Sequence, residues 1–138
     1  MFEISERAHA GLQLMATLAS SYEKEERLSL KTIAEEAGIS PTYLEEIAAA
    51  LRKAHLIEGR QGPGGGYRLT HPPAEITLEQ IATALEGQVM LVECQKSPSI
   101  SCPQEKNCRT KNVWHGLQRL VQTHLRSTSL SDILSSSP

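Results

Sequence analysis

Apolar residues recur at helical spacing near the start of the chain. Steps of four and three over about residues 5–21 predict an amphipathic helix. Its buried stripe is expected to consist of Ala8, Leu12, Met15, Ala19 and Tyr22. The charged segment YEKEER that follows predicts a solvent-exposed loop.

Two more helices are predicted directly afterwards. Ser29 is suited to cap the first, with Ile33, Ala34 and Ala37 on its inner face, and Gly38 to end it in a left-handed conformation. Ser40 is expected to cap the second, with Pro41 at its first position. The expected inner face of that helix is Leu44, Ile47, Ala48 and Leu51. This order is typical of a helix-turn-helix, although a helix pair in another α-helical domain remains the alternative.

The next segment predicts a β-hairpin. LIEGR and YRL are strand-like and flank a turn rich in glycine and proline, QGPGGG. A phosphate-binding P-loop would end in Gly-Lys-Ser/Thr and open a helix, which this segment does not. A hairpin after a helix-turn-helix is the wing of a winged-helix domain. Its glycines suit positive φ angles and a close approach to DNA phosphates.

A winged-helix interpretation assigns DNA contacts to particular side chains. The outward face of the second helix, Thr42, Glu45, Glu46 and Ala49, is expected to face the major groove, unless it is merely a solvated face. Hydroxyls and N–H groups in its first turn are suited to phosphates. The expected contacts to phosphate or the minor groove are Thr42, Tyr43, Arg52, Lys53, Arg60, Gln61 and Arg68, with Lys31 a weaker candidate.

The C-terminal half predicts a short helix, a polar segment and a long helix. Thr77 and Gln80 form a capping box for LEQIATALEG, which Gly87 ends. The long helix has a seam with coiled-coil spacing, made of Val113, Leu117, Leu120 and His124, with Val121 beside it. The seam predicts dimerisation, with packing on its own domain as the alternative. The tail STSLSDILSSSP predicts one more helical turn.

Composition narrows the class of protein. The chain has 138 residues, 39% hydrophobic and 22% charged, with no apolar run that could span a membrane and no signal-peptide pattern at its start. We therefore expect a cytoplasmic protein with reduced thiols. The net charge is −2, and residues 1–70 hold eight lysines and arginines against ten acidic residues. DNA binding would therefore depend on the local placement of charge.

All three cysteines lie in the polar segment CQKSPSISCPQEKNC, spaced C-x7-C-x5-C. Soft thiolates suit iron–sulfur clusters, Zn²⁺ and Cu(I), but the close cysteine pair of structural zinc sites is absent. An iron–sulfur cluster is favoured, while zinc, a thiol switch or inert cysteines remain alternatives. No C-x-x-C pair or catalytic constellation indicates an enzyme. An iron–sulfur carrier would not need the wing.

The order of these motifs resembles the IscR/Rrf-type transcription regulators. The resemblance covers residues 1 to 134 and rests on the first helix, ISPTYLEEIAAALRKAHLI, RQGPGGGYRL, PPAEITLEQIATALEG and the cysteine segment. It implies a mainly α fold with a small β-hairpin and homodimeric binding to a palindromic operator. It also implies control of DNA affinity by an iron–sulfur cluster, with 2Fe–2S favoured and 4Fe–4S possible. The implied role is iron, iron–sulfur, redox or NO homeostasis.

The resemblance also implies individual roles, and the chain departs from some of them. Cys94, Cys102 and Cys108 are the implied cluster ligands. The family commonly has C-x5-C-x5-C with a histidine three residues later, where this chain has Lys111, a poor ligand. His115 is therefore a possible fourth ligand. Less favoured are His9 and Glu6 of the partner chain, which flank the position of a ligating carboxylate in related regulators.

Two DNA-contact positions are also implied. Glu45 matches a position that accepts a hydrogen bond from the cytosine N4 amino group. Gln61 replaces an arginine that enters the minor groove, although Arg60 precedes it. The expected organisation is a winged helix-turn-helix domain at 1–75, a connecting helix at 76–91, a cluster-binding segment at 92–109 and a dimerisation helix with tail at 110–138.

Overall fold

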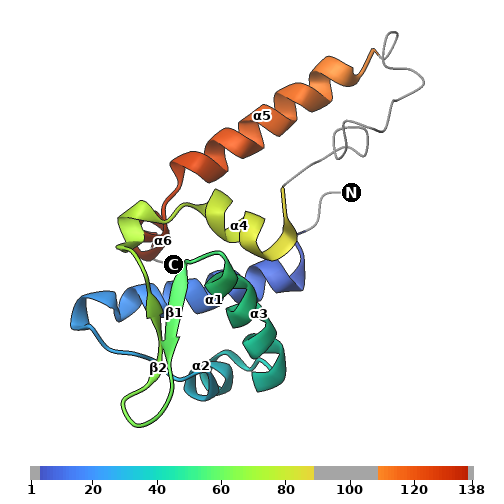
Figure 1. The fold of residues 1–138 in the computed structure, drawn as a ribbon. Helices are drawn as coiled ribbons and strands as arrows, with labels where there is room; N and C mark the ends of the chain where they lie inside the picture. The colour runs from blue at the N-terminus through green and yellow to red at the C-terminus, as the bar shows by residue number, and fades with distance from the viewer. Residues whose placement is uncertain (1–3, 89–108, 137–138) are drawn as a thin grey trace.

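The computed structural model describes residues 4–88 and 109–136. It confirms a mainly α fold with one small hairpin (Figure 1). The elements are α1 (Glu6–Ser20), η1 (Tyr22–Lys24), α2 (Leu30–Ala37), α3 (Pro41–Lys53), β1 (Ile57–Arg60), β2 (Gly66–Leu69), η2 (Pro73–Glu75), α4 (Leu78–Glu86), α5 (Lys111–Ser127) and α6 (Leu130–Ser135). Within this part of the chain, no helix combines the length and apolar character needed to cross a membrane.

Helices α2 and α3 form the expected helix-turn-helix. Gly38 ends α2 with φ 69° and ψ 30°, the left-handed conformation that glycine adopts without a steric penalty. The predicted inner face of α3 is confirmed, because Leu44, Ile47, Ala48 and Leu51 are all fully buried. Ala37 was wrongly assigned to the core. It is exposed because it ends α2, where the chain turns away from the contact with α3.

The buried face of α1 differs from the predicted stripe. Ala8, Leu12 and Tyr22 are only half-buried, because α1 is covered by α3, α4 and α6 together rather than by a single neighbour. The buried arc is therefore wide and shifted around the helix. It consists of Ala10, Gly11, Leu14, Met15, Leu18 and Ala19.

The hairpin is antiparallel, with Ile57 opposite Leu69 and both side chains in the core. Leu28 extends its β2 edge through two main-chain hydrogen bonds with Tyr67, at 3.0 and 2.8 Å. Gly66 makes this close pairing possible, because a Cβ there would lie 2.6 Å from the Leu28 carbonyl oxygen. The wing is thus joined to the chain just before α2.

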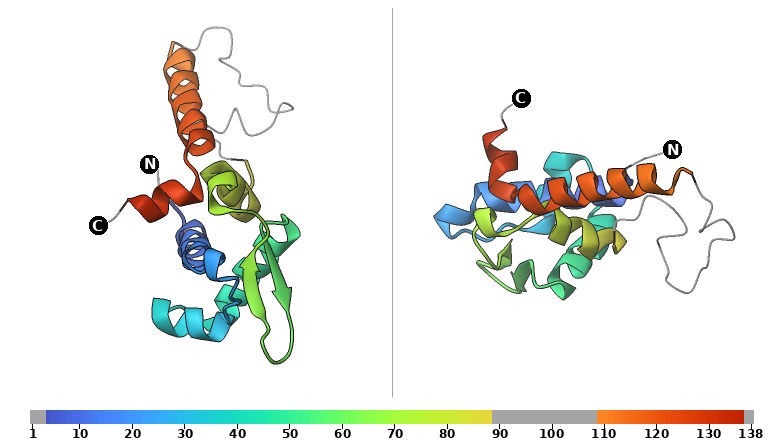
Figure 2. Two further views of the ribbon diagram at one scale, coloured as in Figure 1. Left: turned by 90° about the vertical axis from the view of Figure 1, so that its left-hand side faces the viewer. Right: turned by 90° about the horizontal axis from the view of Figure 1, so that it is seen from above.

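The C-terminal elements complete the core. The predicted capping box of α4 is confirmed, with hydrogen bonds of 2.9 and 3.2 Å between Thr77 and Gln80. Leu130 of α6 is fully buried, and its N–H donates to the Ile76 carbonyl at 2.8 Å. Helix α5 contacts α4 and projects from the body formed by the other elements (Figure 2). The domain boundaries proposed from sequence remain a prediction.

Candidate nucleic-acid interface and cysteine segment

The outward face of α3 is open to solvent. Thr42, Glu45, Glu46 and Ala49 are all exposed, as their spacing opposite the buried face requires. Tyr43 is half-buried and packs against the core, so its ring is partly occupied in holding α3 in place. The helix therefore offers a small polar and acidic surface.

The N-terminus of α3 lacks a side-chain cap. Ser40 occupies the N-cap position, but its hydroxyl accepts no hydrogen bond, so the predicted side-chain cap is wrong. The corresponding hydroxyls of other helices accept from the helix backbone: Ser5, Ser29, Thr77 and Ser129. The first-turn N–H groups of α3 are thus not used by Ser40, and such groups favour anions.

The basic residues of α3 lie at its other end. Arg52 and Lys53 are exposed in the last turn, about 15–18 Å from the N-terminus at 1.5 Å per residue. Cations there interact favourably with the helix dipole whether or not DNA is bound. Lys31 is exposed in the first turn of α2.

The predicted wing contacts fall into two groups. Arg60 and Gln61 are exposed where β1 leads into the glycine-rich tip. Arg68 is half-buried, and its Nε donates to Glu58 Oε1 at 2.5 Å. The hydrogen bond and the charge of Glu58 raise the pKa of Arg68 above its ordinary value. Arg68 therefore already has an anionic partner within the protein.

The three cysteines lie outside the described residues. Their segment follows Gln88, after α4, and ends before Arg109, ahead of α5. Across the described ranges, no group of three or more His, Cys, Asp or Glu side chains is arranged to hold a metal ion. The donors for a metal would therefore have to include the cysteine segment, whose three thiolates match the donor chemistry of an iron–sulfur cluster.

The first turn of α1 lies beside the end of α4. Ser5 Oγ donates to Glu86 Oε1 at 2.6 Å, and Arg7 Nε donates to the Leu85 carbonyl at 3.0 Å. Glu6 and His9, both exposed on this part of α1, therefore lie near the point where their own chain enters the cysteine segment. His115 is half-buried on α5, one turn after the half-buried Lys111.

Part of the predicted seam of α5 is exposed. Gln118 is buried, whereas Val113 and Leu120 are 65% and 69% exposed. At about 100° per residue, both lie roughly 140–160° around the helix from Gln118. Of the other seam residues, His124 is exposed and Leu117 and Val121 are half-buried. Val113, Leu120 and His124 are therefore left exposed, whereas Leu117 and Val121 are partly covered.

Comparison with known proteins identifies the family. The Rrf2 family, described as an iron-dependent transcriptional regulator, matches residues 4–136. The chain belongs to the Rrf2 family. It is 30% identical over 132 residues to the rrf2 protein of Nitratidesulfovibrio vulgaris, covering 96% of this chain and 87% of that one. Its relatives are transcriptional regulators, and it is accordingly a DNA-binding transcriptional regulator of this family.

Two solved Rrf2-family structures have the same fold over nearly the whole chain. The structure of CymR, the global cysteine regulator of B. subtilis, superimposes with a TM-score of 0.81 at 33% identity, covering 100% of both chains. IscR of T. potens superimposes with a TM-score of 0.77 at 34% identity, covering 99% of this chain and 89% of that one. These likenesses confirm the winged-helix fold with its C-terminal helix.

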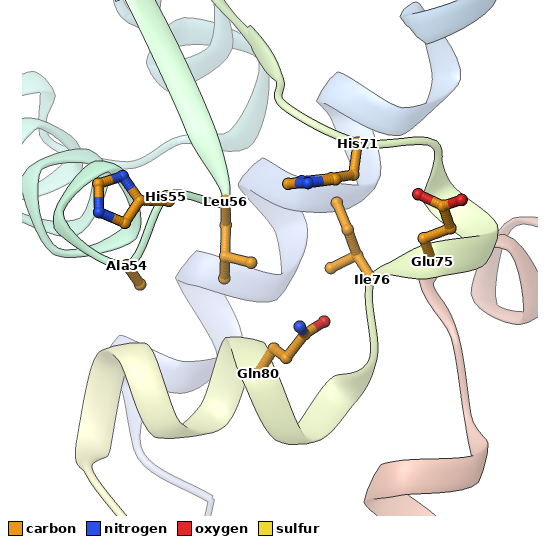
Figure 3. Close-up of a pocket in the computed structure, with 7 residues that line it drawn as sticks. All are labelled: Ala54, His55, Leu56, His71, Glu75, Ile76 and Gln80. Carbon is orange, nitrogen blue, oxygen red and sulfur yellow. The ribbon is translucent and has the colours of Figure 1, made fainter.

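A hollow of about 260 Å³ lies between the α3–β1 turn and the start of α4 (Figure 3). Leu56 and Ile76 are its buried residues, and the exposed residues lining it include His55 and His71. Its volume is below the 300–1,000 Å³ typical of small-molecule sites. His71 Nδ1 is already hydrogen-bonded to Thr70 Oγ1 at 2.8 Å. We assign this hollow no ligand in the Rrf2-family function.

The sequence interpretation missed Arg27. Its Nη2 lies 3.7 Å from Glu58 Oε1, the same oxygen that binds Arg68. The hairpin register could have predicted the pairing of Glu58 with Arg68, because opposite charges face each other across the strands. Nothing in the local sequence links Arg27 to them, because its segment reaches the hairpin only in the tertiary structure.

Proposed function

We propose that this Rrf2-family protein is a homodimeric regulator whose operator affinity is controlled by an iron–sulfur cluster held by Cys94, Cys102 and Cys108. One observation carries the proposal: all three cysteines lie between α4, which packs on the DNA-binding core, and α5, which projects from it. The description of the family as iron-dependent and the likeness to an IscR structure support it. As a transcriptional regulator, the protein would act in the cytoplasm and without enzymatic activity.

Dimerisation would occupy the exposed part of the α5 seam. Val113 and Leu120 expose apolar surface at coiled-coil spacing, and a second copy offers the same surface in return. A two-fold dimer would present two α3 helices to a palindromic operator. The half-sites of such operators lie about 34–36 Å apart, so the angle between the two protomers matters for affinity.

The cluster would act through the placement of α5. When bound, it links three thiolates to one inorganic core that can change redox state or be lost. The chain's own contribution is to hold α5 against α4, through the 2.5 Å contact from Arg126 Nε to Glu79 Oε2. A coupling of about 1–3 kcal/mol would change operator affinity roughly five- to 150-fold.

The fourth ligand remains to be assigned. His115 is the first candidate, because it lies one turn into α5, the helix that follows the cysteine segment. His9 or Glu6 of the partner chain is the second. Either would be a weaker ligand than cysteine, which suits a cluster that must be lost or altered in order to signal.

A second candidate function is a thiol- or zinc-based regulator without a cluster. The similarity to the global cysteine regulator of B. subtilis favours it, because that likeness covers both chains completely. Both functions use the same DNA-binding half and differ only in the chemistry at the cysteines.

Anaerobic purification distinguishes the two. We expect coloured protein with iron and acid-labile sulfide, and loss of both in Cys102→Ala but not in the neighbouring Ser101→Ala. Operator affinity, measured by fluorescence anisotropy at fixed ionic strength, should differ between the cluster-loaded and stripped forms. Colourless protein with stoichiometric zinc, or affinity that changes only on thiol oxidation, would contradict the cluster and favour the second candidate.

A further inference from the structure

Helices α1 and α3 contact the strands of the wing, but the hairpin itself is short. Each strand has four residues, and a two-stranded hairpin is marginally stable on its own. Ile57 and Leu69 anchor its inner face in the core. The outer face needs stabilising contacts of its own if the tip is to keep a constant position relative to α3.

The side chains of Glu58, Arg68 and Arg27 meet on that outer face. Strand alternation puts Glu58, Arg60 and Arg68 on the face opposite Ile57 and Leu69. Glu58 and Arg68 are register partners, and their side chains are joined at 2.5 Å. Leu28 pairs with Tyr67 on the edge of β2 that does not face β1. The preceding residue, Arg27, therefore lies beside Arg68. Its guanidinium then reaches the same Glu58 oxygen.

Arg27 depends on Glu58 more than Arg68 does. The Arg27 side chain is only 19% exposed, and its Nη1 is buried with no hydrogen-bond partner in the described part of the chain. A buried cation that loses its counter-ion is strongly disfavoured, so removal of Glu58 would force Arg27 to move. Arg68 and Glu58 are 42% and 43% exposed, and such exposed pairs contribute little to stability. These three charged side chains are therefore better suited to setting the orientation of the wing than to adding stability to the fold.

We propose that Glu58 is a positioning residue for DNA binding. By holding Arg27 and Arg68 together, it joins β1, β2 and the segment before α2, and so sets the direction in which the wing presents Arg60 and Gln61. In this role Arg68 binds Glu58 within the protein and does not contact a DNA phosphate. The inference rests on the proposed contact between the wing and DNA.

A different role for Glu58, that of neutralising DNA-binding arginines, predicts a change in operator affinity of the opposite sign. If Glu58 only neutralised two DNA-binding arginines, its removal would free them for phosphates, strengthen binding and steepen its dependence on salt. As a positioning residue, its removal weakens operator binding although the net charge becomes more positive. The direction of the change therefore decides between the two roles.

The test compares Glu58→Gln with Glu75→Gln in the full, anaerobically purified chain. Both substitutions raise the net charge by one, and Glu75 is an exposed residue of η2, away from the wing. The probe is a labelled duplex that the wild-type protein selects from a random-sequence pool, with a scrambled duplex for non-specific binding. We expect Glu58→Gln to lose roughly five- to tenfold in affinity for the selected duplex only, with an unchanged salt slope. Glu75→Gln should bind like the wild type.

Two further variants keep the outcome interpretable. The charge-swapped double variant Glu58→Arg with Arg68→Glu should recover most of the lost affinity, which a mere loss of stability would not predict. Arg60→Ala tests the wing contact itself and should flatten the salt slope. Normal binding by Arg60→Ala would contradict the wing contact. If Arg60→Ala weakens binding but Glu58→Gln binds the operator as well as or better than the wild type, the role of Glu58 alone is overturned. The same conclusion follows if the charge-swapped double variant folds but still binds the operator weakly.

Discussion

The turn from α3 into the wing depends on a strained residue. His55 has φ 61°, a left-handed conformation that costs a non-glycine residue about 1–2 kcal/mol. The backbone there is held on both sides: its N–H donates to Arg52 O at 2.9 Å, and its carbonyl accepts from Thr70 Oγ1 at 2.6 Å. The surrounding hydrogen bonds therefore determine the conformation, and the imidazole does not.

We expect His55→Gly to stabilise the protein. Glycine adopts this φ without a steric penalty and keeps both backbone hydrogen bonds, so the free energy of unfolding should rise by about 0.5–1 kcal/mol despite the added chain entropy. Thermal unfolding measures the change. Ala54→Gly is the matched control, because Ala54 has φ −83° and should lose stability on the same substitution. A lower melting temperature for His55→Gly would mean that its ring contributes contacts of its own.

At the scale of elements, α3 carries acidic residues on the face that is predicted to enter the major groove. Glu45 is exposed one turn into the helix, on the same face as Thr42 and Ala49. A carboxylate is unfavourable beside phosphates unless it accepts a hydrogen bond from a base, and cytosine N4 is the suitable donor. Helix α3 is therefore suited to discriminating between base sequences more than to raising the overall affinity for DNA.

Glu45→Ala should relax sequence preference without abolishing binding. We expect the penalty for replacing the contacted C·G pair to fall from about 1–3 kcal/mol toward zero. Competition between duplexes that differ at single base pairs measures this penalty. Glu75→Ala makes the same charge change outside α3 and should leave the preference intact. An unchanged preference in Glu45→Ala would indicate that Glu45 only contributes to a solvated face.

For the whole molecule, the placement of α5 decides how the proposed dimer interface is connected to the DNA-binding core. It leaves the body with Val113 and Leu120 exposed, while α6 beyond it returns to the core through the buried Leu130 (Figure 2). The helix is thus tied to the DNA-binding core through α4 along its side and through α6 at its end. Such an arrangement can transmit a change at the proposed dimer interface to the position of α3.

Leu120→Glu should break the proposed dimer. Burying a carboxylate in an apolar seam costs several kcal/mol, so the variant should sediment with a mass near 15.1 kDa while the wild type shows twice that value. Asn112→Glu is the control, because it is exposed on α5 but lies about 100° around the helix from Val113. A dimeric Leu120→Glu would place the interface elsewhere.

Much of this architecture could be predicted from short-range patterns. The left-handed Gly38, the Thr77–Gln80 box and the buried face of α3 each depend on residues that follow one another at intervals of at most four positions. The hairpin likewise follows from two strand-like segments around a glycine-rich turn. The exposed faces of α3 and α5 also follow, because a helix that buries one side must expose the other.

Other features could not be predicted in this way. The buried arc of α1 is set by three helices that meet on it from distant parts of the sequence, so periodicity alone gave the wrong stripe. Gly11 is part of that arc because Leu85 of α4 lies where a Cβ would be. The burial of Leu130 and the meeting of Arg27 with Glu58 also join segments far apart in the chain.

The amino-acid sequence alone determined the helix-turn-helix, the wing and the capping box of α4, because backbone conformation and helical spacing depend on neighbouring residues. Only the tertiary structure decided which face of α1 is buried, that α6 completes the core and that Arg68 is already paired within the protein. Those outcomes depend on which distant segments come into contact, because burial and ion pairing are properties of the packed chain.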